Sequence, residues 1–176
     1  MPQLSNQAKA IPVPTHSRVH ARLQDAYFAD CYEVAAHDNL ASALQLYLKA
    51  VAQTPTWVEQ LMRARNRFVA IFGLKDLGSL GGIDPSKAAA DYKVGDRVGI
   101  FTIHSLSDGE VVFADSDKHL DAHISLCKTG ADQQAGLALS TVVHVHNAWG
   151  RLYLFFVVPV HRIIVPAMLK RITLHK

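Results

Sequence analysis

The sequence predicts an α+β fold in which a curved antiparallel sheet grips a long C-terminal helix. Three observations favour this class. One strand-like and two helix-like segments come first, four strand-like segments separated by turn residues follow, and the sequence ends with an apolar stretch too long for a strand. A twisted antiparallel sheet with one apolar face needs a cover, and the final segment is the only predicted element large and apolar enough to provide it.

The length of 176 residues fits one domain, and 49% hydrophobic with 19% charged residues is typical of a globular protein. We expect a flexible N-terminal arm over residues 1–18 and a single domain over 19–176. The net charge of +3, without a basic tract, argues against nucleic-acid binding. Cys31 and Cys127 are far apart and no signal-peptide pattern is present, so we expect reduced, packed thiols in a cytoplasmic protein.

The first predicted elements are a strand and a helix. Residues 25–36 are rich in aromatic and β-compatible types, and alternation places Phe28, Tyr32 and Val34 on one face. A helix follows, with Asp38 or Asn39 as its cap and its end near Gln53. Its apolar positions have helical spacing and are Leu40, Ala43, Leu44, Tyr47, Leu48 and Val51.

A second helix is predicted over residues 55–72. Thr54 is a good N-cap, and Pro55 is tolerated at the first helical position because no N–H is needed there. Gly73 suits the C-terminal cap. The stripe expected to be buried consists of Trp57, Leu61, Ala64, Phe68 and Phe72.

Residues 75–96 are expected to form a connector with one helical turn at 85–90, and their LGSLGG run lacks the GK[ST] ending of a phosphate-binding loop. Four strands are then predicted, over residues 97–105, 110–114, 118–127 and 136–147, in the manner of an antiparallel meander. Asp108-Gly109 is a strong hairpin signal between the first two. A hairpin between the last two strands would pair His119 with His144 and Asp121 with Val142.

The C-terminal segment also needs to be tested as a membrane span. Residues 152–169 are just long enough, but His161 and Arg162 lie at the middle, and Pro159 and Pro166 interrupt the backbone. A central arginine costs roughly 2.5–3.5 kcal/mol on insertion scales. We therefore expect a buried core helix, bent in one direction by its two prolines, and no stable insertion into a membrane.

Several stretches of the sequence resemble a known family. They are PTWVEQLMRARNRFVAIFGLK, GDRVGIFTIHS, DSDKHLD and VVHVHNAWGRLYLFFVVPVHRIIVPAMLKR, and the likeness covers roughly residues 19–171. These stretches resemble the bacterial domain-of-unknown-function family 2867, which we associate with the START-like (SRPBCC), Bet v 1-like helix-grip group. The resemblance implies a sheet and a gripped helix that enclose an apolar cavity. It implies no established activity, and relatives are sometimes fused to short-chain dehydrogenase-like domains.

Ten histidines are present, and several share a predicted strand face. Alternation places His119, Asp121 and His123 on one side of residues 118–127, and His144 and His146 on one side of the last strand. One interpretation is a site for proton transfer or for a divalent metal, since imidazole and carboxylate bind zinc or iron. Its catalytic candidates are His119, Asp121, His144 and His146, and the first three are the metal candidates. The other interpretation is the solvated outer face of a sheet that is buried on one side.

Asn147 lies at the junction of the last strand and the last helix, where its side-chain oxygen is expected to accept a hydrogen bond from the N–H of Trp149 or Gly150. His161 and Arg162 lie among apolar neighbours, where a buried charge needs a partner. Arg162 could reach an acidic residue on the sheet or the carboxylate of a ligand.

Three functional hypotheses follow from the sequence. The first is a non-enzymatic module that binds a small apolar or amphipathic, lipid-like molecule and needs no cofactor. The second is an enzyme that uses the histidine face, and the third is a partner of a separate short-chain dehydrogenase-like oxidoreductase. A homodimer is left open. The candidate ligand-binding residues are Trp57, Phe68, Trp149, Tyr153, Phe156, His161 and Arg162.

Overall fold

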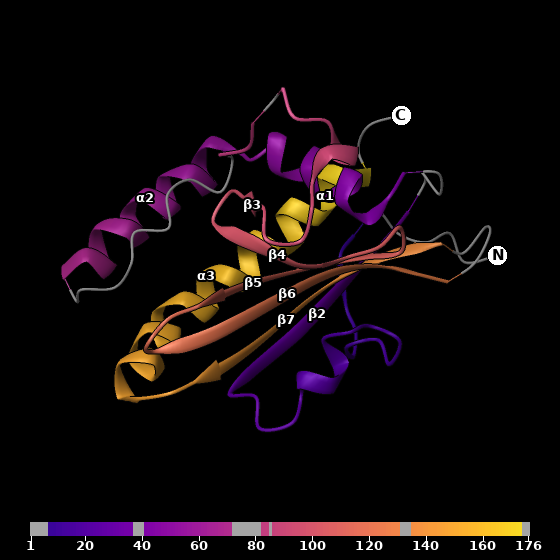
Figure 1. Cartoon of the computed structure of the whole chain (residues 1–176). Coiled ribbons are helices and arrows are strands. Elements are labelled where there is room, and N and C mark those ends of the chain that lie inside the picture. The colour runs from indigo at the N-terminus through magenta and orange to yellow at the C-terminus, as the bar shows by residue number, and fades with distance from the viewer. Residues whose placement is uncertain (1–6, 37–40, 72–81, 85, 131–134, 174–176) are drawn as a thin grey trace.

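The computed structural model describes residues 7–36, 41–71, 82–84, 86–130 and 135–173 (Figure 1). In these residues the fold is α+β and helix-grip-like, as predicted. A seven-stranded antiparallel sheet has the order β1-β2-β7-β6-β5-β4-β3. The strands are β1 (Lys9–Ala10), β2 (Phe28–Ala35), β3 (Arg97–Val98), β4 (Phe101–Leu106), β5 (Glu110–Ser116), β6 (Leu120–Thr129) and β7 (Gly136–Val145).

Three α-helices in the described residues accompany the sheet. Helices α1 (Ala43–Ala52) and α2 (Thr56–Ile71) follow β2, and α3 (Ala148–Thr173) follows β7. Helices α1 and α3 lie against one face of the sheet, which we call the inner face, while α2 extends away from it (Figure 1). Two short 3₁₀ helices, η1 (His20–Arg22) and η2 (Ala89–Asp91), lie in the connections.

The strand order agrees with the prediction, but two details differ. The strand predicted over residues 97–105 is split into β3 and β4 by a turn at Gly99, whose φ of 59° suits glycine. The predicted β6–β7 register is wrong by two residues, because Asp121 pairs with His144 instead of Val142. Pairing continues as far as Thr129 and Gly136, so the connecting loop is shorter than expected. A shift of two residues leaves each side chain on its predicted face.

Helix α1 begins at Ala43 and is capped by Ser42, so the prediction of an Asp38 or Asn39 cap is wrong, although those two residues lie outside the described part of the chain. The Ser42 hydroxyl accepts a hydrogen bond from the N–H of Gln45, and the Gln45 side chain accepts one from the N–H of Ser42. This reciprocal capping box satisfies two donors that the helix cannot satisfy itself.

Helix α2 does not bury the predicted stripe. Trp57 and Leu61 are 38% and 37% exposed, Ala64 is also exposed, and Val58 is the residue that is fully buried. The prediction is wrong because α2 packs little against the sheet, so apolar spacing in its sequence does not mark a core face. The side chain of Phe68, the residue Phe72 and the proposed cap Gly73 lie outside the described part of the structure.

Helix α3 runs across the inner face and continues through Pro159 and Pro166. Its inward side buries Leu154, Val165, Met168, Leu169 and Ile172. Its outward side is also apolar, with exposed Leu152, Phe155 and Ile163. By length and composition α3 could cross a membrane, a criterion that core helices also meet. The helix packs against the sheet as predicted, but it is buried on one side only.

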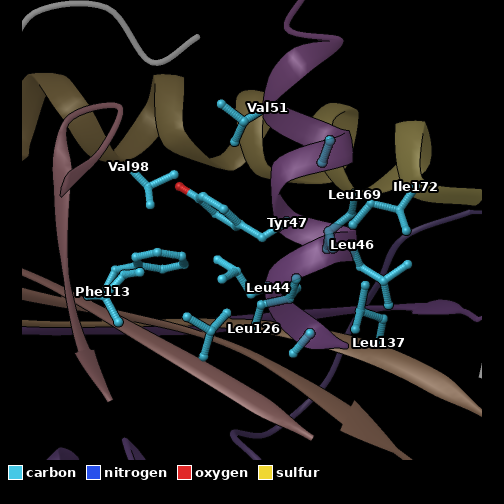
Figure 2. Packing of buried hydrophobic residues seen from close by; sticks show 14 of the residues in the cluster. Leu44, Leu46, Tyr47, Val51, Val98, Phe113, Leu126, Leu137, Leu169 and Ile172 are labelled. Carbon is cyan, nitrogen blue, oxygen red and sulfur yellow. The ribbon is translucent and has the colours of Figure 1, made fainter. Parts of the chain in front are cut away.

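The main hydrophobic core fills the space where α1 and the C-terminal part of α3 meet the sheet. Figure 2 shows Leu44 and Tyr47 of α1 above Phe113 and Leu126 of the sheet, with Leu169 of α3 beside them. The rings of Tyr47 and Phe113 are 4.2 Å apart between centroids. This core joins α1 and the C-terminal part of α3 to the sheet.

The opposite, outer face of the sheet is partly covered by the N-terminal segment. Strand β1 pairs with β2, and Val13 and Val19 pack with Cys127 and Val142 in a second hydrophobic cluster. Cys31 and Cys127 are free and buried, as the sequence predicts, and burial raises the pKa of Cys127 to about 12. The division of the chain at residue 19 stays a prediction.

Candidate functional site

A cavity of about 570 Å³ lies between the inner face of the sheet and the three α-helices. In β2, β6 and β7 every second side chain faces the cavity, and most of these side chains are apolar. Examples are Phe28, Ala122 and Val143. Helix α3 supplies the facing wall with residues such as Val157 and Ile164. The cavity is therefore an apolar space between sheet and gripped helix, beside the main core.

The entrance to the cavity lies between α2 and α3. Leu61 and Ala64 of α2 and Phe156 of α3 line the cavity and are also exposed to solvent. Arg65 of α2 joins the two helices there, because its Nε donates a hydrogen bond of 3.0 Å to the hydroxyl of Tyr153, and its guanidinium lies 5.4 Å from the centre of the Tyr153 ring. This contact holds the two sides of the entrance together.

The structure places the seven candidate ligand-binding residues in different surroundings. Tyr153, Phe156 and His161 line the cavity. Trp57, Trp149 and Arg162 are exposed and do not line it. The side chain of Phe68 lies outside the described part of the structure. Helical spacing identified the correct helix, but the side of α3 that faces the sheet could not be chosen without knowing where the sheet lies.

The strand residues of the cavity wall were not among the ligand-binding residues predicted from the sequence. Phe28 and Val143 are directly paired between β2 and β7, and Thr141 lies two residues before Val143 on the same face. The signal that could have found them was the alternation in β2 and β7, together with the prediction that the final helix covers one face. Arg65 was also missed, because a basic residue on an amphipathic helix normally faces solvent.

One polar pair lies in this apolar region. Nε2 of His161, on α3, is 3.1 Å from Oδ1 of Asp30, on β2, and their side chains are only 18% and 15% exposed. A partner for a buried charge in the middle of α3 was predicted from the sequence. The acidic residue on the sheet exists, but it pairs with His161, while Arg162 is exposed.

Two buried oxygen atoms close to this pair have no hydrogen-bond partner among the described residues. They are Oδ2 of Asp30 and Oγ1 of Thr141. Asp30 and Thr141 are directly opposite each other in the β2–β7 ladder, and Thr141 is 4% exposed and lines the cavity. Buried polar atoms in native proteins are nearly always paired, so two unpaired oxygens on directly opposite residues call for an explanation.

The candidate histidine face lies on the outer side of the sheet, away from the cavity. His146 Nε2 is 3.1 Å from Asp121 Oδ2, and the hydroxyl of Ser116 donates to the other carboxylate oxygen. His144 contacts the carbonyl of Gln24 at 3.1 Å instead. Within the described residues, no three His, Cys, Asp or Glu side chains are grouped so that they could hold a metal ion.

His119 is separated from the other candidates because it lies just before β6 and contacts the residue that precedes α3. Its Nδ1 is 3.1 Å from Oδ1 of Asn147. The same oxygen accepts a 3.2 Å hydrogen bond from the N–H of Gly150, which confirms the predicted cap, and Nδ2 of Asn147 donates to the carbonyl of Lys118. The four catalytic candidates thus make separate contacts, with only Asp121 and His146 joined to each other.

We expect His123, on the same outer face, to make the stability of the protein depend on pH. It is 8% exposed, and burial lowers its pKa from 6.5 to about 4, with Arg22 and His104 adding to the effect. The unfolded chain takes up this proton near pH 6.5 and the folded chain only near pH 4. The contribution of His123 to the free energy of unfolding is therefore fully present above pH 6.5 and is lost as the pH drops toward 4.

We expect this loss to be about 1–2 kcal/mol, less than the full pKa difference implies because solvent near the ring screens the charge. Urea unfolding at pH 7 and pH 4.5 measures it. His123→Gln should lose less stability than the wild type over the same interval. An equal loss in both proteins would assign the acid sensitivity to other groups.

The fold and the cavity define a class: a helix-grip-like α+β domain with an apolar internal space. The profile of a family described as proteins of unknown function, DUF2867, matches residues 22–168, and the chain belongs to this family. The predicted membership of the domain-of-unknown-function family 2867 is thereby confirmed. No curated protein and no solved structure matches the chain.

Proposed function

We propose that the protein binds a small apolar or amphipathic, lipid-like molecule in the cavity between the sheet and its helices. The observation that carries this proposal is the cavity itself. Its volume of about 570 Å³ lies within the roughly 300–1,000 Å³ of small-molecule sites, and its walls are mostly apolar with a few polar groups. An occupant of that chemistry buries apolar surface on both partners.

Packing energetics supports the same proposal. Protein interiors are close-packed, and an unfilled apolar space costs stability because its walls lose van der Waals contacts. In the main core beside the cavity, by contrast, Phe113 and its apolar neighbours fill the available space. An occupant recovers the missing contacts, and its entry is possible through the exposed gap between α2 and α3.

Filling the cavity from within is the direct test. Ala122 points into the cavity from β6, and Ala122→Phe places a ring where a ligand would lie. Ala29 is exposed on the outer face of β2, so Ala29→Phe is the matched control. We expect a library of fatty alcohols, fatty acids and aromatic compounds to raise the Tm of the wild type and of the control.

For the best compound, Ala122→Phe should weaken binding at least about tenfold, a change of about 1.4 kcal/mol. A ligand at one hundred times its Kd stabilises the fold by about 2.7 kcal/mol, which a thermal scan resolves. Absence of any hit with the wild type, or equal affinity in Ala122→Phe and Ala29→Phe, would contradict the proposal.

The other hypotheses from the sequence stay predictions. Elemental analysis and His146→Ala test an enzyme that uses the outer histidine face. A pull-down tests a short-chain dehydrogenase-like partner, and the mass in solution tests a homodimer. The cytoplasmic location is a prediction of the same kind.

A further inference from the structure

We propose that the occupant of the cavity carries an uncharged hydroxyl group that binds at Asp30, Thr141 and His161, and that the cavity discriminates against carboxylic acids. This inference rests on the proposed function, because it names the chemical class of the molecule that the cavity takes. It is carried by three things: the position of the polar pair, the two unpaired oxygens, and the charges of the cavity wall.

The position follows from the sheet register. Asp30 on β2 pairs with Thr141 on β7, and both side chains lie on the inner face. His161 reaches Asp30 from α3, and its ring packs edge-on against Phe28 with centroids 5.6 Å apart. Because Thr141 and His161 both line the cavity, the polar group forms part of an otherwise apolar wall.

The two unpaired oxygens have complementary needs. The Asp30 carboxylate is an acceptor only, while the Thr141 hydroxyl can both donate and accept. A hydroxyl group on a ligand can donate to Oδ2 of Asp30 and accept from the Thr141 hydroxyl at the same time. Thr141 already lines the cavity, so rotation about its χ1 turns the hydroxyl toward an occupant without a backbone movement.

The charges of the wall argue against an acid. Among the described residues, the charged residues of the lining are one cation, Arg65, and two anions, Asp115 and Asp117. Asp30 is adjacent to the lining, because it contacts His161, which lines the cavity. Arg65 is engaged by Tyr153 and by Asn66, to whose side-chain oxygen its Nη1 donates at 2.9 Å. A ligand carboxylate beside Asp30 would therefore face a like charge in a poorly solvated space, where repulsion is strong.

The test compares three probes built on the same straight decyl-length carbon chain: decanol, methyl decanoate and decanoic acid, measured by calorimetry at about pH 8. The ester is neutral and can only accept, and the acid is ionised. We expect the wild type to bind decanol about tenfold more tightly than the ester, as a hydrogen bond to a charged group implies, and to bind the acid most weakly.

Two conservative variants separate this role from a structural one. Thr141→Val keeps the shape and removes a hydroxyl that has no hydrogen-bond partner in the described part of the chain, so it should fold with at least the Tm of the wild type. It should also reduce the preference for decanol over the ester several-fold. Asp30→Asn should raise the affinity for decanoic acid about tenfold, a gain that mere damage to the fold cannot produce.

The outcomes are distinguishable. If the wild type binds none of the three probes, both the proposed function and this inference fail. If the acid or the ester binds as tightly as decanol, or if neither variant changes the order of the three affinities, the inference is overturned and the proposed function stands. Preference for decanol with both variant effects supports the inference.

Discussion

Phe113→Ala is expected to lower the free energy of unfolding by about 4 kcal/mol, the middle of the usual range for a buried aromatic residue. Phe113 has no exposed surface, and its ring lies 4.2 Å from that of Tyr47 between centroids. The substitution removes the contact by which β5 holds α1 on the sheet (Figure 2). Helix α1 cannot move far into the space left by the ring, because it is also packed against α3.

Urea unfolding followed by circular dichroism measures this loss. Phe155→Ala is the matched control, since it deletes the same ring from a side chain of α3 that is 73% exposed. Its effect should stay within about 0.5 kcal/mol. Similar losses in the two variants would mean that the Phe113 ring is not a central part of the core.

Glu110→Ala is expected to cost about 3 kcal/mol and to release the N-terminal segment from the outer face. The Glu110 carboxylate, 8% exposed, accepts hydrogen bonds of 2.7 Å from Ser17 and 2.6 Å from Ser125, and the N–H of Arg18 donates to both of its oxygens. Alanine leaves two buried hydroxyls without this acceptor, and hydrogen bonds to a charged group each contribute about 1.5–3 kcal/mol.

Hydrogen exchange separates release of the segment from general unfolding. In Glu110→Ala, amides of residues 13–23 should lose protection while those of β6 and β7 keep most of theirs. Glu110→Gln, which retains one acceptor oxygen, should lie between alanine and the wild type. Unchanged protection at Val19 in the alanine variant would show that other contacts, such as its packing in the second hydrophobic cluster, hold the segment.

The fold could be predicted to a large extent because its main signals are local. Turn residues such as Asp108-Gly109 mark the strand ends, and alternation in β2 placed Phe28 and Val34 on the correct face. The cap at Asn147 also depends on neighbours in sequence. Register and helix orientation depend on contacts distant in sequence. The β6–β7 pairing was therefore missed by two residues, and the exposure of Trp57 was not foreseen.

The cavity was predicted less completely than the fold. The apolar and aromatic composition of the final helix was evident in the sequence, and Tyr153, Phe156 and His161 do line the cavity between this helix and the sheet. The partner of His161 could not be assigned, because Asp30 is 131 positions away and only the sheet brings the two together. Histidine spacing pointed instead to the outer face, where alternation is equally regular but the histidines do not line this cavity.

The location of a bound alkyl chain tests the central proposal most directly. With protein labelled at its methyl groups and unlabelled decanol, nuclear Overhauser contacts should appear at inner-face methyls of Ile124 and Leu139 and at Ile164 of α3, all of which line the cavity. Methyls of Val112 and Val142, buried on the outer face, should show none. Contacts confined to the exposed side of α3, at Leu152 and Ile163, or no contacts at all, would contradict the account.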